Sequence, residues 1–216
     1  MDGTADELIA RLRRNPEDAA AYHALKVHYH RLADWASLVN LLEGFGGRSA
    51  DAMTASQSYF EAGELAWGAL HDQARGMRFY ERSLERNGSH PEAFARLSSL
   101  YEAAGDHARV AEMIERRADA LSRAGADPRE VAALHQRLGE LWEHTFQRAD
   151  KAILHYRRAF EMDATLVPAI YAAREIYRQA GNLKAVATLC ELEAKAEPDP
   201  ERRDRKSTRL NSSHRL

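Results

Sequence analysis

The chain of 216 residues contains only one cysteine, Cys190. A single cysteine excludes an internal disulfide, and it also excludes a metal site built from two or more thiolates. Chains without disulfides are typical of reducing compartments. The sequence therefore favours a cytoplasmic location.

Long apolar runs are also missing from the sequence. No stretch approaches the roughly 18 consecutive apolar residues that a membrane-spanning helix needs, and residues 1–14, MDGTADELIARLRR, lack the apolar centre of a secretory signal peptide. We predict no membrane partner and no signal peptide in this sequence, although a signal would be lost if Met1 were an internal start of a longer gene.

The last residues break abruptly with the composition of the rest. Residues 204–214, DRKSTRLNSSH, resemble the in-frame translation of a common sequencing-library adapter, and Arg215 and Leu216 fill the two codons that an index would occupy. We interpret 204–216 as non-native sequence within a disordered tail over 197–216; a native Ser/Arg-rich tail is the alternative. An open reading frame that runs into an adapter has no natural end, so we expect a fragment of a larger protein.

An excess of positive charge is absent as well. The 31 Lys and Arg stand against 33 Asp and Glu, and removing residues 204–216, with four basic and one acidic residue, leaves 27 against 32, a net charge of −5. Binding to nucleic acid or to an anionic membrane needs a basic field, so we predict no nucleic-acid partner. Only four of the remaining basic residues are lysines, a bias that is typical of GC-rich bacterial genomes.

Internal self-similarity is the strongest feature that is present. A shift of 76 residues places Gly63, Glu64 and Leu65 on Gly139, Glu140 and Leu141. The same shift makes further pairs, namely Tyr80 with Tyr156, Ala93 with Ala169, Tyr101 with Tyr177, Gly105 with Gly181 and Val110 with Val186. A shift of 72 residues pairs Tyr22 with Phe94, Leu25 with Leu97, Tyr29 with Tyr101 and Asp34 with Asp106. A fixed shift of this kind indicates a repeat protein.

The repeated pattern resembles the tetratricopeptide repeat (TPR), in which a first helix W-x₂-L-G-x₂-Y precedes a second helix A-x₃-F. The matching residues are Phe94, Leu97, Tyr101 and Gly105 in one unit, and Leu138, Gly139, Trp142, Ala152, Tyr156 and Ala159 in another. The resemblance covers about residues 17–196 and departs from the pattern at Gly76, Ser98 and Arg174. It implies an all-α fold, a right-handed α-solenoid of stacked antiparallel helix pairs.

The local sequence is also typical of helix pairs. Small residues such as Gly63, Gly139 and Ala159 let helix backbones approach, and larger apolar residues at helical spacing fill the gaps between them. Turn residues that stop one helix and cap the next occur at 31–34, 103–106 and 179–182. We predict no strands and eleven helices, at 5–14, 17–32, 34–44, 51–70, 73–87, 91–104, 106–124, 128–145, 149–162, 166–180 and 182–196. Residues 1–14 then hold the second helix of an incomplete repeat, and 17–196 the TPR-like array.

The histidines are the first candidates for catalysis or metal binding. His23, His28 and His30 lack the i, i+4 pairing that zinc sites on helices prefer. A second group, His135, His144 and His155, has no cysteine or paired aspartate to complete a site. We interpret the histidines as solvated or groove-lining.

The remaining chemical candidates are weak too. The glycine-rich GFGG at 44–47 lacks the Lys-Ser/Thr of a phosphate-binding loop, so we expect a flexible helix connector. Cys190 fits a small buried residue, and Glu140 and Glu143 fit a charged helix surface. The recurring aromatic residues Trp67, Trp142, Tyr80 and Tyr156 are expected in the core. We predict no catalytic residues, no cofactor and no metal.

The resemblance implies a groove lined by the first helix of each pair. Carried over by register, its residues are His23, Val27, His30, Phe60, Glu64, Trp67, Ala95, Ser99, Glu102, Gln136, Glu140, Glu143, Tyr171, Glu175 and Arg178. Family members that clamp C-terminal carboxylates of heat-shock chaperones use Lys and Asn there, which this sequence does not show.

The sequence thus favours a non-enzymatic scaffold, part of a larger bacterial TPR protein, that binds partner peptides or helices in this groove. The alternative is a substrate-docking or regulatory module of an enzyme whose catalytic domain lies elsewhere. RNA reading by helical repeats is a third hypothesis, and the net charge argues against it.

Overall fold

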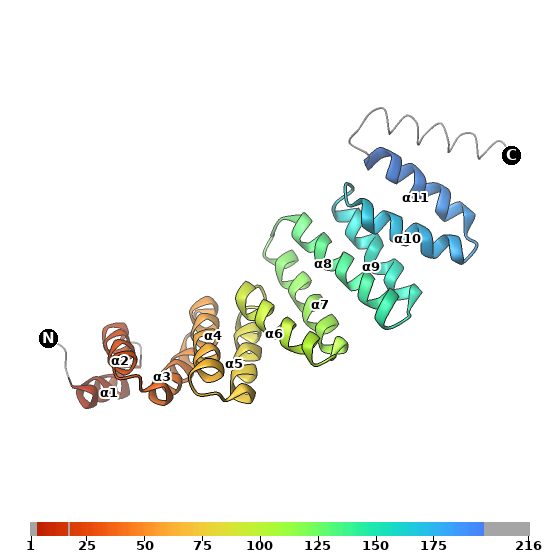
Figure 1. The fold of residues 1–216 in the computed structure, drawn as a ribbon. Coiled ribbons are helices and arrows are strands. Elements are labelled where there is room, and N and C mark those ends of the chain that lie inside the picture. The colour runs from red at the N-terminus through yellow and green to blue at the C-terminus, as the bar shows by residue number, and fades with distance from the viewer. Residues whose placement is uncertain (1–3, 17, 197–216) are drawn as a thin grey trace. The chain divides into compact units, whose positions relative to one another are not determined.

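The computed structural model describes residues 4–16 and 18–196. These residues form eleven α-helices and a π-helical turn, with no strand among them (Figure 1). The elements are α1 Ala5–Arg14, α2 Ala19–Arg31, α3 Trp35–Arg48, α4 Ala52–Gly68, α5 Gln73–Arg86, α6 Pro91–Ala103, α7 His107–Arg123, α8 Pro128–Glu140, the π-helical turn η1 Leu141–Thr145, α9 Ala149–Met162, α10 Val167–Gln179 and α11 Leu183–Ala196. The predicted tail at 197–216, with its adapter-like residues, lies outside the described residues.

Side-chain caps set the starts of most helices. A carboxylate accepts a hydrogen bond from a backbone N–H in the first turn at Asp18, Asp34, Asp51, Asp72, Asp106 and Asp127. Such a bond satisfies one of the N–H groups that the helix itself leaves unpaired. The cap at Asp18 explains why the helix predicted from residue 17 begins at Ala19 instead.

A left-handed residue follows the first helix of each pair. Its φ is positive at Ala33 (52°), His71 (54°), Gly105 (70°), Gln147 (56°) and Gly181 (72°). The successive spacings are 38, 34, 42 and 34 residues, and 34 is the typical TPR period. The two longer spacings contain the 17-residue helices α4 and α7, and the second also contains η1.

The chain divides into two compact units, residues 1–104 and 105–216. In each unit the helices pack chiefly on their neighbours in the sequence, α1 to α6 in the first and α7 to α11 in the second. The predicted all-α class of TPR-like helix pairs is confirmed. The division into an incomplete repeat at 1–14 and one array over 17–196 stays a prediction; Leu8 of α1 packs on Ala21 and Leu25 of α2.

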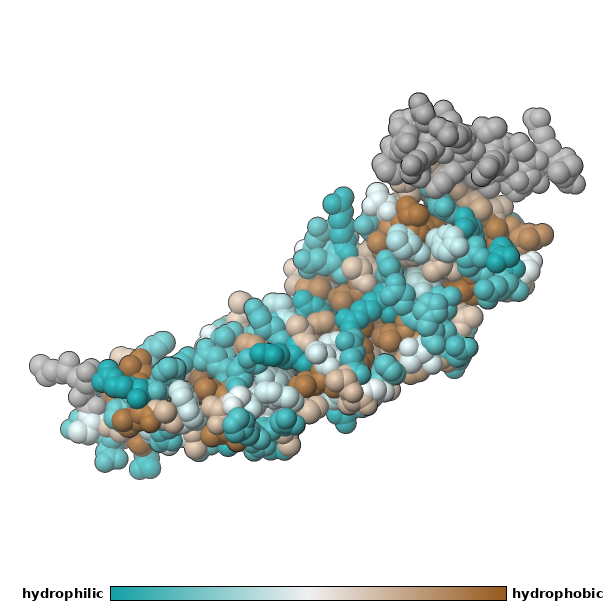
Figure 2. Space-filling model, in the orientation of Figure 1, coloured by the Kyte–Doolittle hydropathy of each residue, from teal (hydrophilic) through white to brown (hydrophobic). Residues whose placement is uncertain are grey.

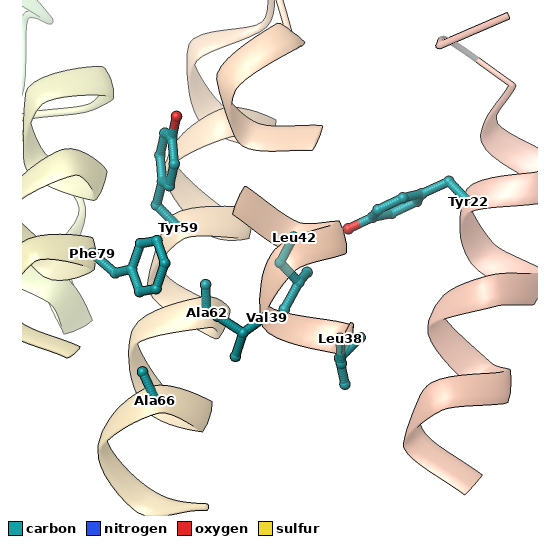
Figure 3. Packing of buried hydrophobic residues seen from close by; sticks show 8 residues of the cluster. All are labelled: Tyr22, Leu38, Val39, Leu42, Tyr59, Ala62, Ala66 and Phe79. Carbon is teal, nitrogen blue, oxygen red and sulfur yellow. The ribbon is translucent and has the colours of Figure 1, made fainter. Parts of the chain in front are cut away.

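The core of the first unit runs through four consecutive helices (Figure 3). Its buried residues are Tyr22 of α2, Leu38, Val39 and Leu42 of α3, Tyr59, Ala62 and Ala66 of α4, and Phe79 of α5. Alanines on α4 leave room for the larger side chains of α3 and α5. Each helix therefore buries apolar area on both neighbours in the chain.

Two glycines mark the closest helix approaches, as predicted. A Cβ on Gly63 would lie 2.6 Å from Cε1 of Tyr80, and one on Gly139 would lie 2.5 Å from Cδ1 of Tyr156. Both tyrosine rings are almost completely buried. Gly76, a departure from the family pattern, lies opposite Gly63, because its Cβ would be 3.3 Å from the Gly63 carbonyl oxygen.

Residues 44–47 are not a flexible connector, so that prediction was wrong. They form the last turns of α3, which continues to Arg48. Gly46 is buried, and a Cβ there would lie 3.2 Å from the carbonyl oxygen of Ala55 and 3.3 Å from the Tyr59 ring. Close packing on α4 thus requires glycine inside the helix and compensates for its low helix propensity.

The helix predicted over 128–145 changes its form before its end. It is α-helical to Glu140 and then widens into η1, where the N–H of Phe146 donates to the carbonyl of Leu141 at 3.0 Å. This i to i+5 spacing is that of a π-helix. The sequence pattern did not distinguish it from an α-helix.

Replacing Gly139 by alanine is expected to lower the free energy of unfolding by about 1–3 kcal/mol, because the new methyl group collides with the buried Tyr156 ring. Denaturant unfolding followed by circular dichroism measures the change. Gly68→Ala is the matched control, since no atom lies within 4 Å of its Cβ position. Equal stability of the two variants would contradict the assigned helix contact.

Candidate protein-binding surface

Five of the predicted groove residues come together between α4 and α6. Phe60, Glu64 and Trp67 of α4 and Ala95 and Ser99 of α6 line a cavity of about 460 Å³. Its other lining residues are Tyr80, Glu92, Arg96 and Leu100. The cavity therefore has an apolar part on Phe60, Trp67 and Leu100, with charged groups beside it.

Glu64 is held in this cavity by two donors. The Tyr80 hydroxyl donates to Glu64 Oε1 at 2.6 Å, and an Arg96 Nη donates to Glu64 Oε2 at 2.8 Å. Burial of the ring, and then the bond to Glu64, raise the pKa of Tyr80, so its hydroxyl stays a donor. The carboxylate is fixed in position by these bonds.

A second cavity, of about 540 Å³, lies between α2 and α4. It is lined by Ala19, Tyr22, His23 and Lys26 of α2, Phe45 of α3, Met53, Thr54, Gln57, Ser58 and Glu61 of α4, and Asn87, His90, Pro91 and Glu92. Of the residues predicted for the groove, it includes only His23. The two cavities share Glu92, and together we call them the α2–α4–α6 groove.

Contacts within the first unit support the walls of the α2–α4 cavity. The rings of Tyr22 and Phe45 stack with centroids 3.9 Å apart, and burial raises the pKa of Tyr22 to about 12. Lys26 forms an ion pair with Glu61 across α2 and α4. His90 bonds Gln57 through Nε2 at 3.2 Å. The polar side chains of this wall thus have partners from the chain itself.

The remaining predicted residues of the first unit are exposed but lie outside both cavities. Val27 of α2 is 56% exposed, and His30 is exposed with its ring 5.2 Å from that of Trp35. Glu102 is exposed near the end of α6. None of these three residues lines either cavity, so the predicted stripe is wider than the two cavities. Figure 2 shows apolar residues scattered among polar ones over the visible surface.

The predicted groove residues of α8 and η1 are bound within their own unit. Gln136 donates to Glu140 at 2.9 Å, and the Tyr156 hydroxyl donates to Glu143 at 2.7 Å. The 76-residue repeat shift places Trp67 of the first unit on Glu143. The Trp67 side chain cannot accept this hydrogen bond, and Tyr80 donates to Glu64 instead. Glu143 is thus partly exposed and has a structural partner in Tyr156.

The predicted groove residues of α10 form a charged cluster. Tyr171 is 51% exposed beneath the Arg174 guanidinium, which lies 4.7 Å from the ring centroid. Glu175 accepts from Arg178 at 2.8 Å and pairs with Arg174 at 3.5 Å. Cys190 is only half-buried, with its sulfur 4.0 Å from Arg174, so the prediction of a buried cysteine was wrong.

Sequence reasoning missed much of the lining of the groove. Arg96 and Leu100 lie next to the predicted positions on α6, and Gln57 and Glu61 lie one turn before those on α4. Phe45 lies on a second helix, which the family pattern does not assign to the groove. Extending the predicted stripe to both edges of each first helix would have found all of these except Phe45.

His135 and His155 are buried, contrary to the interpretation of the histidines as solvated or groove-lining. Their Nδ1 atoms lie 3.3 Å apart, and the rings stack at 5.5 Å. Glu115 of α7 approaches Nε2 of His155 at 3.8 Å. Burial and the facing His135 lower the pKa of His155 to about 4, and burial and Arg158 lower the pKa of His135. The pair is therefore neutral near pH 7.

Residues 4–16 and 18–196 contain neither a grouped set of metal ligands nor a membrane span. Within these ranges, no three potential His, Cys, Asp or Glu ligands are close enough to hold a metal ion together. No helix there is both long and apolar enough to cross a bilayer.

The buried histidine pair makes stability depend on pH. The lowered pKa of His155 means that its contribution is complete above the ordinary pKa of 6.5 and is lost as the pH falls toward about 4. We expect a loss of up to about 3 kcal/mol over this range, since each pKa unit corresponds to about 1.4 kcal/mol. Denaturant unfolding from pH 7 to pH 4 measures it. A His155→Phe variant should show a shallower dependence, and identical slopes would contradict the assignment.

Similar proteins are found among solved structures. No family model and no curated protein matches the chain. Among solved structures, a protein described as MamA is 11% identical, covers 82% of this chain and 91% of its own, and gives a TM-score of 0.45. The N-terminal domain of stress-induced protein-1 from C. elegans is 15% identical over 59% of this chain and 98% of its own, at a TM-score of 0.45.

A third solved structure is described as YrrB, "a TPR protein with an unusual peptide-binding site". It is 15% identical, covers 95% of this chain and 100% of its own, and gives a TM-score of 0.42. The described residues themselves carry the paired helices, the glycine contacts and the turn spacing that the sequence predicts for a TPR protein. Each unit of the chain has the all-α, TPR-like fold of paired helices.

Proposed function

We propose that the chain is a non-enzymatic protein-interaction scaffold and that it binds a peptide or helix of a partner protein in the α2–α4–α6 groove. The observation that carries the proposal is the pair of adjoining cavities, about 540 and 460 Å³, that share Glu92. Hollows of this size that combine apolar and polar lining are the usual form of a binding site.

The apolar part of the groove supplies the affinity in this proposal. Phe60 and Trp67 are half-buried, so each ring has area left for a ligand. Phe60 is also fixed from behind, since its ring lies 5.9 Å from that of Tyr80 and 5.1 Å from that of His90. Half-buried aromatic residues that are already ordered are typical anchors of protein interfaces.

The polar part of the groove supplies orientation. Glu64 and Arg96 are bound to one another, and so are Glu61 and Lys26. A partner therefore meets polar groups whose positions are already fixed, and it loses less conformational entropy in ordering them. The charges of these pairs are balanced, which fits a protein partner better than the phosphates of a nucleic acid.

Glu61 and Glu64 of the groove are each held in an ion pair with a basic side chain, which favours binding over acid–base catalysis. The same groove would serve as a docking module if a longer protein carried a catalytic domain. The DNA sequence of the source gene tests that alternative.

A Phe60→Ala/Trp67→Ala double variant is expected to weaken ligand binding at least about tenfold, because both anchors of the groove are removed. The ligands are peptides selected on the unaltered protein from a random phage library, and fluorescence anisotropy measures their Kd.

Leu154→Ala is the matched control. Leu154 is an apolar residue of α9 that is 39% exposed and lines neither cavity, so its removal should leave the Kd unchanged. Selected peptides that bind the double variant as tightly as the unaltered protein, with the helical circular dichroism intact, would refute the groove as the site.

A further inference from the structure

Another hollow in the first unit is lined by residues of α1, α2 and α3. It has a volume of about 520 Å³ and is bounded by α1 and α3, with α2 between them. Its lining residues are Ile9, Leu12, Arg13, Pro16, Leu25, Tyr29, Ser37, Asn40, Leu41, Gly44 and Arg48. We call it the α1–α3 cleft.

The cleft and the α2–α4–α6 groove use neighbouring faces of α2. Successive residues of an α-helix are about 100° apart. Leu25 of the cleft is therefore roughly 60° around the helix from Tyr22 of the groove, and Tyr29 of the cleft is roughly 20° from Tyr22 but two turns further along. The cleft and the groove have no lining residue in common.

The floor of the cleft is apolar. Ile9, Leu12, Tyr29 and Leu41 pack against the buried Leu25 in one cluster, and all four are only partly buried. Their remaining exposed area faces the hollow that they line. An aliphatic side chain from a partner would bury this area, and burial of apolar area favours binding.

One end of the cleft is basic. The last turns of α1 and α3 both contribute side chains to the lining of the cleft. These turns carry Arg13 and Arg48, which are both exposed. The Arg48 guanidinium lies over Gly44, 3.3 Å from the position of a Cβ there. Within residues 4–16 and 18–196, no carboxylate lines the cleft and neither arginine has an ion pair.

Two carboxylates lie near Tyr29 but do not line the cleft. The pKa of Tyr29 is raised by burial and then by the charges of Asp34, the N-cap of α3, and Asp6 in the first turn of α1. Asp34 is occupied as the cap of α3, where it accepts from the N–H of Ser37 at 3.1 Å. The polarity of the cleft gives a negatively charged ligand one preferred end.

Another pair of arginines in the same unit shows how this chain binds a carboxylate. A shift of 38 residues, the spacing from Ala33 to His71, places Ser37 on Arg75 and Gly44 on Arg82. These two arginines hold the carboxylate of Glu43, at 3.1 and 2.6 Å. Beneath them lie the rings of Phe79 and Tyr59, at 5.3 and 4.3 Å from the guanidinium carbons. There the chain itself provides the anion.

We propose that the α1–α3 cleft binds an acidic peptide segment of a partner protein, with its carboxylates on Arg13 and Arg48 and an aliphatic side chain on the floor. In this proposal the partner supplies to Arg13 and Arg48 a carboxylate of the kind that Glu43 supplies to Arg75 and Arg82. Arginine suits this role, because its planar group binds carboxylates with two parallel hydrogen bonds. This inference concerns a different surface from the proposed groove and does not depend on it.

The test measures binding of a fluorescein-labelled peptide with one leucine between two pairs of aspartates. Its counterparts carry lysine in place of aspartate, or serine in place of leucine. We expect the aspartate–leucine peptide to bind most tightly, and added salt to weaken it. An Arg13→Glu/Arg48→Glu double variant should reduce its affinity at least about tenfold, because attraction becomes repulsion.

Two control variants test whether the peptide lies in the cleft rather than elsewhere on the surface. Arg14→Glu changes an exposed arginine of the same helix that does not line the cleft, and Phe60→Ala/Trp67→Ala removes the anchors of the groove. Both should bind the peptide as the unaltered protein does, and circular dichroism checks that every variant is folded.

The proposal is overturned if the lysine peptide binds as tightly as the aspartate peptide, if the serine peptide binds equally well, or if Arg14→Glu weakens binding as much as the double variant. Loss of binding on removal of Phe60 and Trp67 would place the peptide in the groove, and it would also overturn the proposal. Binding to vesicles of anionic phospholipid without binding to the peptide would assign the cleft to a membrane instead.

Discussion

The contact of a helix backbone with the face of a buried tyrosine is the constraint on which the rest of the structure depends. Tyr80 and Tyr156 fill the space that Gly63 and Gly139 leave empty, and their hydroxyls reach glutamates of the preceding helix. The ring thereby sets the separation of the two helices, and the hydroxyl sets their rotation. In the first unit the same bond orients Glu64. The tyrosine that packs α5 on α4 therefore also fixes the polar wall of the groove.

Local chemistry explains how much of the fold was readable from the sequence. Aspartate caps and left-handed stops act within a few residues, so the turns near Asp34, Gly105 and Gly181 were predicted correctly. The end of α3 and the form of η1 depend on what packs beside them. Gly46 is helical because Tyr59 and Ala55 lie against it, and no pattern within residues 44–47 reveals that contact.

The candidate site was predictable to the extent that helical periodicity determines it. Phe60, Glu64 and Trp67 follow one stripe of α4, and the structure brings them to one cavity. Periodicity predicts the face of the helix on which a residue lies, but not the residue of another helix that it contacts. It therefore could not show that Glu143 accepts a hydrogen bond from Tyr156 or that the rings of His135 and His155 lie together, because these pairs join different helices.

The contribution of α2 to two hollows has a consequence for assembly. This one helix lines both, and the two hollows share no lining residue, so two polypeptide segments could be seated side by side on it. If both came from one molecule, the first contact would raise the effective concentration of the second. A short helix would then act as a bivalent clamp, able to retain a partner that neither surface holds firmly alone.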